Sequence, residues 1–146
     1  MKEKLLISAC LTGENCKYSG GNNALPEEML RKLRMRYELV PVCPEQLGGL
    51  PTPRTPAERR GDQVITRDGQ DVTAQFAAGA EKVLGIARDQ KIGKALLKAG
   101  SPSCGRDRIY DGSFTGTVIR GNGVTAQLLL AHGIDVFSEE EIARLL

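Results

Sequence analysis

Short apolar runs recur along the chain and end in turn-forming residues. The first, residues 4–9, leads into a loop rich in Gly, Asn and Ser; the second, residues 38–42, into a Cys-Pro pair. The third, residues 94–99, ends at a glycine, and a shorter run occupies residues 135–137. Apolar runs of this length between turn formers predict four β-strands.

Longer segments between these runs carry apolar residues at helical spacing. Residues 26–36 place Pro and acidic residues in the first turn and basic residues in the last, which favours a helix. Residues 71–90 have a longer apolar stripe, and residues 124–132 form a third candidate. Ser138, with Glu141 three residues later, predicts a capped terminal helix.

Three segments have no clear helical or strand pattern. Residues 48–56 hold three prolines and two glycines and predict a rigid surface loop. Residues 63–73 are interpreted either as a small hairpin around Asp68-Gly69 or as a loose excursion of the chain, and residues 112–122 as a glycine-rich loop.

Strands that alternate with helices indicate an α/β fold: a mainly parallel sheet with right-handed crossovers, flanked by helices. A length of 146 residues suits one domain with a full hydrophobic core. We therefore expect a single Rossmann-like domain that spans residues 1–146.

Composition narrows the class of protein. The chain lacks a signal-peptide pattern and any apolar stretch of membrane-spanning length, so we expect a cytoplasmic protein with no membrane partner. A net charge of +2, mixed basic and acidic residues and an aromatic content of 4% make nucleic-acid binding unlikely. The oligomeric state is left open.

Cysteine placement is the strongest chemical signal. Cys10, Cys43 and Cys104 each lie at or just beyond the carboxyl end of a predicted strand, where parallel sheets bind their ligands, whereas Cys16 lies inside the first loop. Three convergent thiolates suit zinc or an iron–sulfur cluster. The chain has no C-x-x-C pair, which disfavours a structural zinc site. The only histidine, His132, lies in a helical segment and is not expected to be a ligand.

Polar residues close to these cysteines are candidates for catalysis and binding. Glu45 follows Cys43 by two residues and is either a general base for water or a solvated loop acid. Ser101 and Ser103 share a turn with Cys104, where hydroxyls orient water or cap backbone groups. Arg54 is either a substrate-binding residue or simply exposed.

Four segments, taken in order, resemble the family of thiouracil desulfidases across essentially the whole chain: SACLTGENCKYSGG, VPVCPEQLGGLPTPR, KAGSPSCG and IYDGSFTGT. The resemblance implies a [4Fe-4S] cluster held by Cys10, Cys43 and Cys104. It also implies that Glu45 and Ser101 flank an open iron, as catalytic base and water-positioning residue. Cys16 is left over.

The implied activity is a non-redox, hydrolytic desulfuration of a thiolated pyrimidine, from thiouracil to uracil and hydrosulfide. Ser103 and Arg54 are expected to bind this small-molecule substrate, which is a free base, a nucleoside or a nucleotide in RNA. The alternatives are a carrier of sulfur or of an iron–sulfur cluster, a cysteine-ligated zinc protein or thiol enzyme, and a metal-free nucleotide-binding domain.

Overall fold

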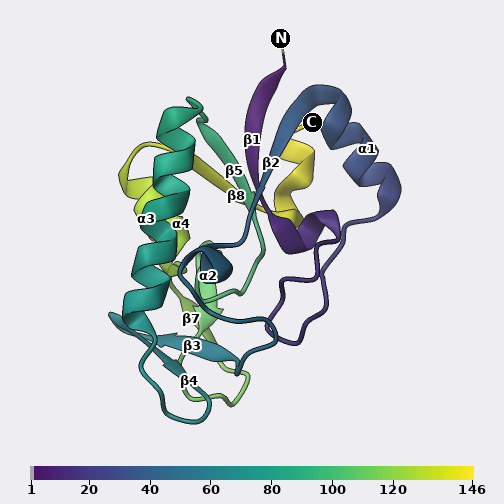
Figure 1. Cartoon of the computed structure of the whole chain (residues 1–146). Helices are drawn as coiled ribbons and strands as arrows, with labels where there is room; N and C mark the ends of the chain where they lie inside the picture. The colour runs from purple at the N-terminus through teal and green to yellow at the C-terminus, as the bar shows by residue number, and fades with distance from the viewer. Residues whose placement is uncertain (1) are drawn as a thin grey trace.

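A four-stranded parallel sheet forms the centre of the molecule (Figure 1). The structure is a computed structural model that describes residues 2–146. The strands are β1 (Glu3–Ser8), β2 (Tyr37–Val42), β5 (Lys94–Leu97) and β8 (Asp135–Ser138). Their order in the sheet is β2-β1-β5-β8, and every neighbouring pair is parallel.

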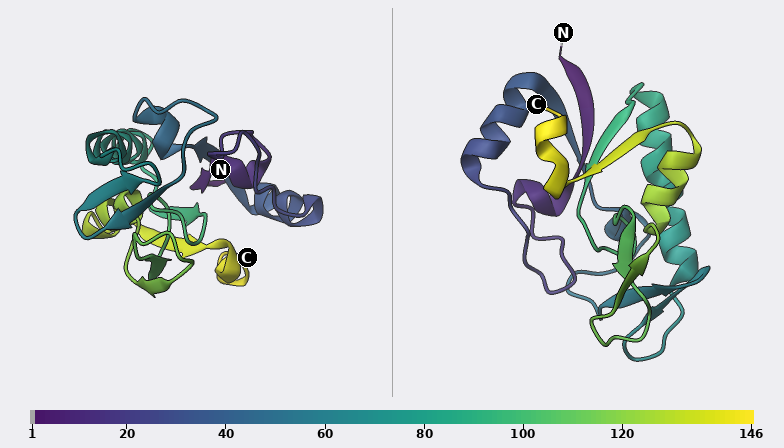
Figure 2. Two further views of the ribbon diagram at one scale, coloured as in Figure 1. Left: turned by 90° about the horizontal axis from the view of Figure 1, so that it is seen from below. Right: turned by 180° about the vertical axis from the view of Figure 1, so that it is seen from behind.

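Helices cover both faces of this sheet (Figure 2). Because successive strand residues point to opposite faces, Leu6 packs with the helices at residues 73–89 and 124–131, while its neighbours Leu5 and Ile7 pack with the helix at residues 27–36 and the carboxyl-terminal segment. The β1 strand is therefore buried from Leu5 to Ser8, which explains its continuous apolar pattern. The helices are α1 (Glu27–Arg36), α3 (Thr73–Asp89), α4 (Val124–Ala131) and the 3₁₀ segment η2 (Glu139–Arg144).

Two antiparallel hairpins lie beyond the carboxyl ends of the strands (Figure 1). Between the sheet and these hairpins come two short helical segments, one directly after β1 and one directly after β2. The short segments are η1 (Ala9–Thr12) and α2 (Pro44–Leu47), and the hairpins are β3 (Ala57–Arg60) with β4 (Gln63–Thr66) and β6 (Arg108–Tyr110) with β7 (Val118–Arg120).

The structure confirms the α/β class and the parallel sheet flanked by helices. The four predicted strands and three α-helices are all present, with ends shifted by up to two residues. The terminal segment is a 3₁₀ helix, and Ser138 and Glu141 form the expected capping box.

The structure corrects two predictions, the hairpin at residues 63–73 and the loop at residues 112–122. The main hairpin turns at Gly61 and Asp62, not at Asp68-Gly69, because residues 57–60 supply its first strand. The Asp68-Gly69 segment forms a tight turn, and Ile65 and Asp71 on either side of it form one isolated β-bridge. The predicted loop at residues 112–122 contains β7, whose three residues are all exposed and give no apolar alternation to detect.

Within residues 2–146, no helix combines the length and the apolar composition that a membrane crossing requires.

Candidate metal centre and active site

All four cysteines line one cavity of about 520 Å³ at the carboxyl edge of the sheet. Cys10 lies in η1 directly after β1, and Cys43 directly precedes α2 after β2. Cys104 lies in the turn that follows β5, and Cys16 reaches the cavity from the loop before α1. The structure thus brings together the three cysteines predicted from strand ends, together with Cys16.

Burial favours the protonated form of three of the thiols, those of Cys10, Cys16 and Cys104. It raises the pKa of Cys104 to about 12, even though hydrogen bonds with the Ser8 and Ser103 hydroxyls act in the opposite direction. Burial also raises the pKa of Cys16 to about 12, with a further contribution from Cys43, and raises the pKa of Cys10 against a hydrogen bond with Asn23. Binding of a soft metal would release these protons, because the thiolate is the ligand form.

The donor set consists of soft sulfur ligands. Within residues 2–146, no three His, Cys, Asp or Glu side chains gather closely enough to hold one metal ion. The thiols are instead distributed around a cavity, and all four are free of disulfide bonds. Soft sulfur donors around such a space suit an iron–sulfur cluster.

Glu45 projects into the same cavity from the first turn of α2. Its Oε1 accepts a hydrogen bond from Arg54 Nε at 3.0 Å, and its Oε2 accepts one from Ser103 Oγ at 3.2 Å. The Arg54 and Glu45 side chains are only 7% and 17% exposed. The carboxylate is therefore held in place and shielded from most of the solvent.

A direct backbone contact between α2 and α3 fixes the position of Glu45. A Cβ atom on Gly79 would lie 1.9 Å from the Pro44 carbonyl oxygen, and one on Gly48 would lie 2.0 Å from the Gln75 carbonyl oxygen. Only glycine permits this approach. The contact places Cys43 and Glu45, which flank Pro44, on a rigid support.

The turn after β5 is held by its own hydroxyls. Ser101 Oγ accepts hydrogen bonds from the backbone N–H groups of Ser103 at 3.2 Å and Cys104 at 3.0 Å. Ser101 Oγ also lies 3.1 Å from Ser103 Oγ, which in turn contacts Glu45. Ser101 thus caps the turn and also belongs to a hydroxyl chain that ends on Glu45.

The start of α4 anchors the same turn from the other side. The N–H groups of Val124 and Thr125 donate to the carbonyl groups of Pro102 and Ser103 at 2.9 and 2.8 Å. A Cβ atom on Gly123 would lie 2.4 Å from the Ser103 carbonyl carbon, so glycine is required for this contact. The backbone that carries Cys104 is therefore fixed by α4.

Arg54 uses most of its donors within the protein. Besides the bond to Glu45, Nη1 donates to Thr52 Oγ1 at 2.9 Å and Nη2 donates to the Cys16 carbonyl oxygen at 2.9 Å. The Cys43 thiol points at the same carbonyl, at 3.8 Å. Arg54 joins the Cys16 loop to Glu45, and one Nη2 hydrogen remains for a ligand.

Several cavity residues were not identified from the sequence. Lys98 Nζ lies 2.7 Å from Glu139 Oε2, and Glu139 Oε1 accepts a bond from the Ala99 N–H group. Lys98 follows β5 directly, so its place at a strand end was a usable signal. The aromatic side chains of Tyr18, Tyr110 and Phe114 also line the cavity; two of the quoted motifs contain them, but the sequence alone does not place their side chains there. His132 lies on the surface beside Arg88, away from the cavity lining.

Comparison with known proteins gives matches across nearly the whole chain. A sequence model of the family described as 2-thiouracil desulfurase matches residues 5–141. The Bacillus subtilis (strain 168) protein YbbK, described as uncharacterized, is 42% identical over 148 residues, which cover 94% of this chain and 97% of YbbK. The solved structure of the [4Fe-4S]-dependent thiouracil desulfidase TudS is 49% identical, has a TM-score of 0.94, and aligns over 99% of this chain and 95% of TudS.

These matches agree with the four motifs and with the thiol-lined cavity. The chain belongs to the 2-thiouracil desulfurase family.

Proposed function

We propose that this protein is a thiouracil desulfidase, which hydrolyses the carbon–sulfur bond of a thiolated pyrimidine with the help of a [4Fe-4S] cluster. Family membership and the 49% identity with TudS over 99% of the chain support the activity and the cofactor. The observation that carries the proposal is the juxtaposition of soft thiols with a held carboxylate, Glu45, in one cavity.

We propose Cys10, Cys43 and Cys104 as the cluster ligands. Each stands at or after a strand of the sheet, and rigid backbone contacts support the last two. Cys16 comes from a loop held through its carbonyl group, and we assign it no ligand role. A cluster held by these three thiolates would leave one iron without a protein ligand and would supply a Lewis acid for the thiocarbonyl sulfur.

The reaction exchanges sulfur for the oxygen of water without net oxidation or reduction. A carbon–oxygen bond forms and the carbon–sulfur bond breaks, so thiouracil and water give uracil and hydrosulfide plus a proton. Glu45 takes a proton from the attacking water through its carboxylate. Arg54 and Ser103 hold that carboxylate at 3.0 and 3.2 Å, so that its basic oxygen is oriented before the water arrives.

The serines and Arg54 have distinct roles in this proposal. Ser101 Oγ already accepts two backbone hydrogen bonds, and its own hydrogen is donated either to Ser103 Oγ, 3.1 Å away, or to the attacking water, which it would then position. Ser103 contacts both Glu45 and the Cys104 sulfur, at 3.2 and 3.5 Å, and stands where substrate meets the carboxylate. Arg54 contributes its remaining Nη2 hydrogen to the substrate.

The cavity volume of about 520 Å³ is adequate for a pyrimidine base. We infer that the substrate is a small molecule and not a nucleotide within RNA, because a net charge of +2 gives little attraction for a polyanion. We further propose that residues 1–146 act as one domain in the cytoplasm.

The test is anaerobic reconstitution followed by metal analysis and a turnover assay. The proposal expects about four iron atoms per chain, almost no zinc, and sulfide release from 2-thiouracil or 4-thiouracil over many turnovers. Release that stops at one sulfide per chain would favour a carrier instead. Reconstituted protein with almost no iron would refute the cluster and the activity together.

A further inference from the structure

The aromatic residues fall into two equal groups with different surroundings. The chain has three Tyr, three Phe and no Trp. Tyr37, Phe76 and Phe137 belong to the hydrophobic clusters beside the sheet and helices. Tyr18, Tyr110 and Phe114 belong to none of the clusters found within residues 2–146, and all three line the thiol cavity. Half of the aromatic side chains are therefore placed at the site and not in the core.

Phe114 is held in a backbone conformation that a bulky residue rarely adopts. Its φ is +58°, in the left-handed region that favours glycine. Its N–H group donates to Glu58 Oε1 at 3.1 Å, and the Gly112 N–H group donates to the same oxygen at 3.0 Å. Glu58, on the neighbouring hairpin strand β3, thus fixes the loop. Strained residues that persist in this way mark functional positions.

The Phe114 ring is also restrained by a charge. The guanidinium of Arg67 lies over the ring, 5.4 Å from its centroid, and both side chains line the cavity. A cation–π contact of this kind fixes ring orientation. The ring is therefore a preformed flat apolar surface at the site, which reduces the entropy cost of stacking a second ring on it.

We propose that Phe114, assisted by Tyr110 and Tyr18, is the surface on which the ring of the substrate stacks, and that it selects planar unsaturated rings. The inference rests on the proposed desulfidase function and adds a specificity determinant that lies apart from the cysteines and Glu45. Stacking on an aromatic side chain accepts any flat base but discriminates against a puckered, saturated ring.

The experiment compares two substrates that share the thiocarbonyl group. One is 2-thiouracil, and the other is its 5,6-dihydro derivative, whose ring is saturated and not planar. With the reconstituted holoenzyme, Phe114→Ala is expected to raise KM for 2-thiouracil roughly tenfold, with kcat changed less than about twofold. KM for the dihydro derivative should stay within about twofold of its wild-type value, since it gains little from stacking.

Two further variants separate aromatic stacking from loop structure. Phe114→Leu keeps an apolar side chain but removes the ring, so it should lose affinity as Phe114→Ala does. Phe114→Tyr should restore KM. The matched control is Val118→Ala, on the same hairpin at 50% exposure and outside the cavity lining, which should behave as wild type.

Binding of uracil, measured by calorimetry, provides a readout that does not depend on turnover. Phe114→Ala and Phe114→Leu should weaken uracil binding by a factor similar to the rise in KM, with iron content and visible absorption unchanged. Unchanged KM and unchanged uracil affinity in both variants would overturn the inference while leaving the desulfidase proposal intact. A wild-type holoenzyme that binds uracil through Phe114 but releases no sulfide would refute the activity and support the stacking surface.

Discussion

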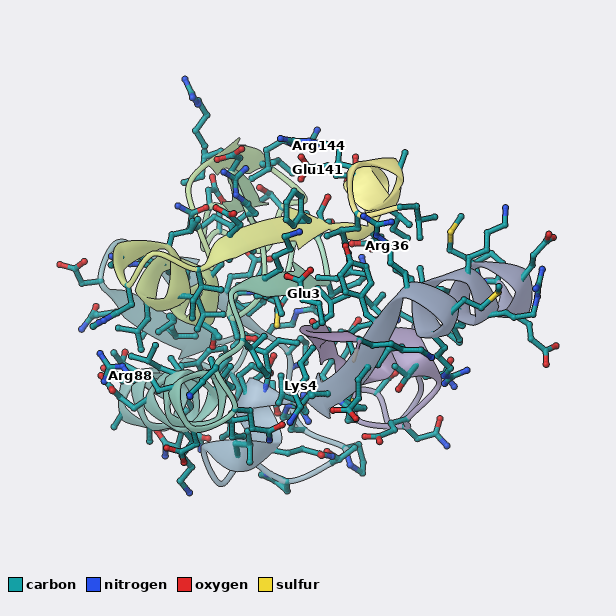
Figure 3. All side chains as sticks on the ribbon, turned by 90° about the horizontal axis from the view of Figure 1, so that it is seen from above. Glu3, Lys4, Arg36, Arg88, Glu141 and Arg144 are labelled. Carbon is teal, nitrogen blue, oxygen red and sulfur yellow. The ribbon has the colours of Figure 1, made fainter. Side chains whose placement is uncertain are left out.

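The ion pairs at the two ends of the central sheet differ in exposure to solvent. Where the strands begin, Lys4 pairs with Glu38 and Lys94 with Glu3, each at 3.6 Å, and these side chains are between 35% and 60% exposed. Figure 3 looks onto this end and shows Glu3 and Lys4 there among charged side chains. Where the strands end, Arg54 and Glu45 pair at 3.0 Å with 7% and 17% exposure.

The difference shows what converts a strand end into a reactive site. The exposed pairs interact through water and carry little energy. At the other end, loops close over the strand ends, and glycine contacts bring α2 against α3 and α4 against the Cys104 turn. Cys16 and Cys104 are buried at this end and Cys10 and Cys43 are half-buried, and low exposure strengthens the electrostatic interactions of Glu45 with its neighbours. Substitutions at the two ends should therefore differ greatly in effect.

The largest effect is expected from the proposed ligands. Cys43→Ser should lose most of its iron and lower desulfuration by more than roughly a hundredfold, because a hydroxyl is a poor substitute for a thiolate. Cys10→Ser and Cys104→Ser should behave alike. Cys16→Ser is the matched control, since it changes a thiol in the same cavity, and it should retain its iron. Iron analysis and visible absorption measure the result. If Cys16→Ser lost its cluster while the other three variants kept theirs, the ligand assignment would be wrong.

The next effect concerns the buried carboxylate. Glu45→Gln keeps the side-chain shape but removes the base, so kcat should fall by about 10² to 10⁴-fold while iron content stays constant. Glu38→Gln, at the opposite end of the sheet, removes an equal charge from an exposed pair and should not change kcat. Steady-state sulfide release on both variants makes the comparison. Equal rates for Glu45→Gln and wild type would contradict the role of general base.

The predictable parts of the fold are those in which a buried face requires apolar residues at regular positions in the sequence. The β1 strand is buried on both faces, so its apolar run was visible, and the α3 stripe reflects one buried face. Parallel strands also share an edge, which allowed convergence of Cys10, Cys43 and Cys104 to be inferred. The order of the strands in the sheet has no such local signal.

The parts that escaped prediction are held by contacts between distant loops. The β7 strand is fully exposed and is recognisable only through its pairing with β6. Phe114 reaches the cavity because Glu58, on a different hairpin, binds its backbone N–H group. Cys16 is placed by a hydrogen bond from Arg54 to its carbonyl oxygen. Interactions of this kind depend on tertiary structure. The segments IYDGSFTGT and SACLTGENCKYSGG contain Phe114 and Cys16, but they do not indicate which distant residues hold them.

The smallest effect is expected where the strands begin. Lys94→Met removes the pair with Glu3, whose side chain is 51% exposed, and should change the free energy of unfolding by less than about 0.5 kcal/mol. Iron content and sulfide release should match wild type, because the altered charge lies at the end of the sheet away from the cavity. Denaturant unfolding and the turnover assay test both statements. A loss of activity in Lys94→Met would mean that the two ends are coupled through β5, which carries Lys94 at its start and leads into the Cys104 turn.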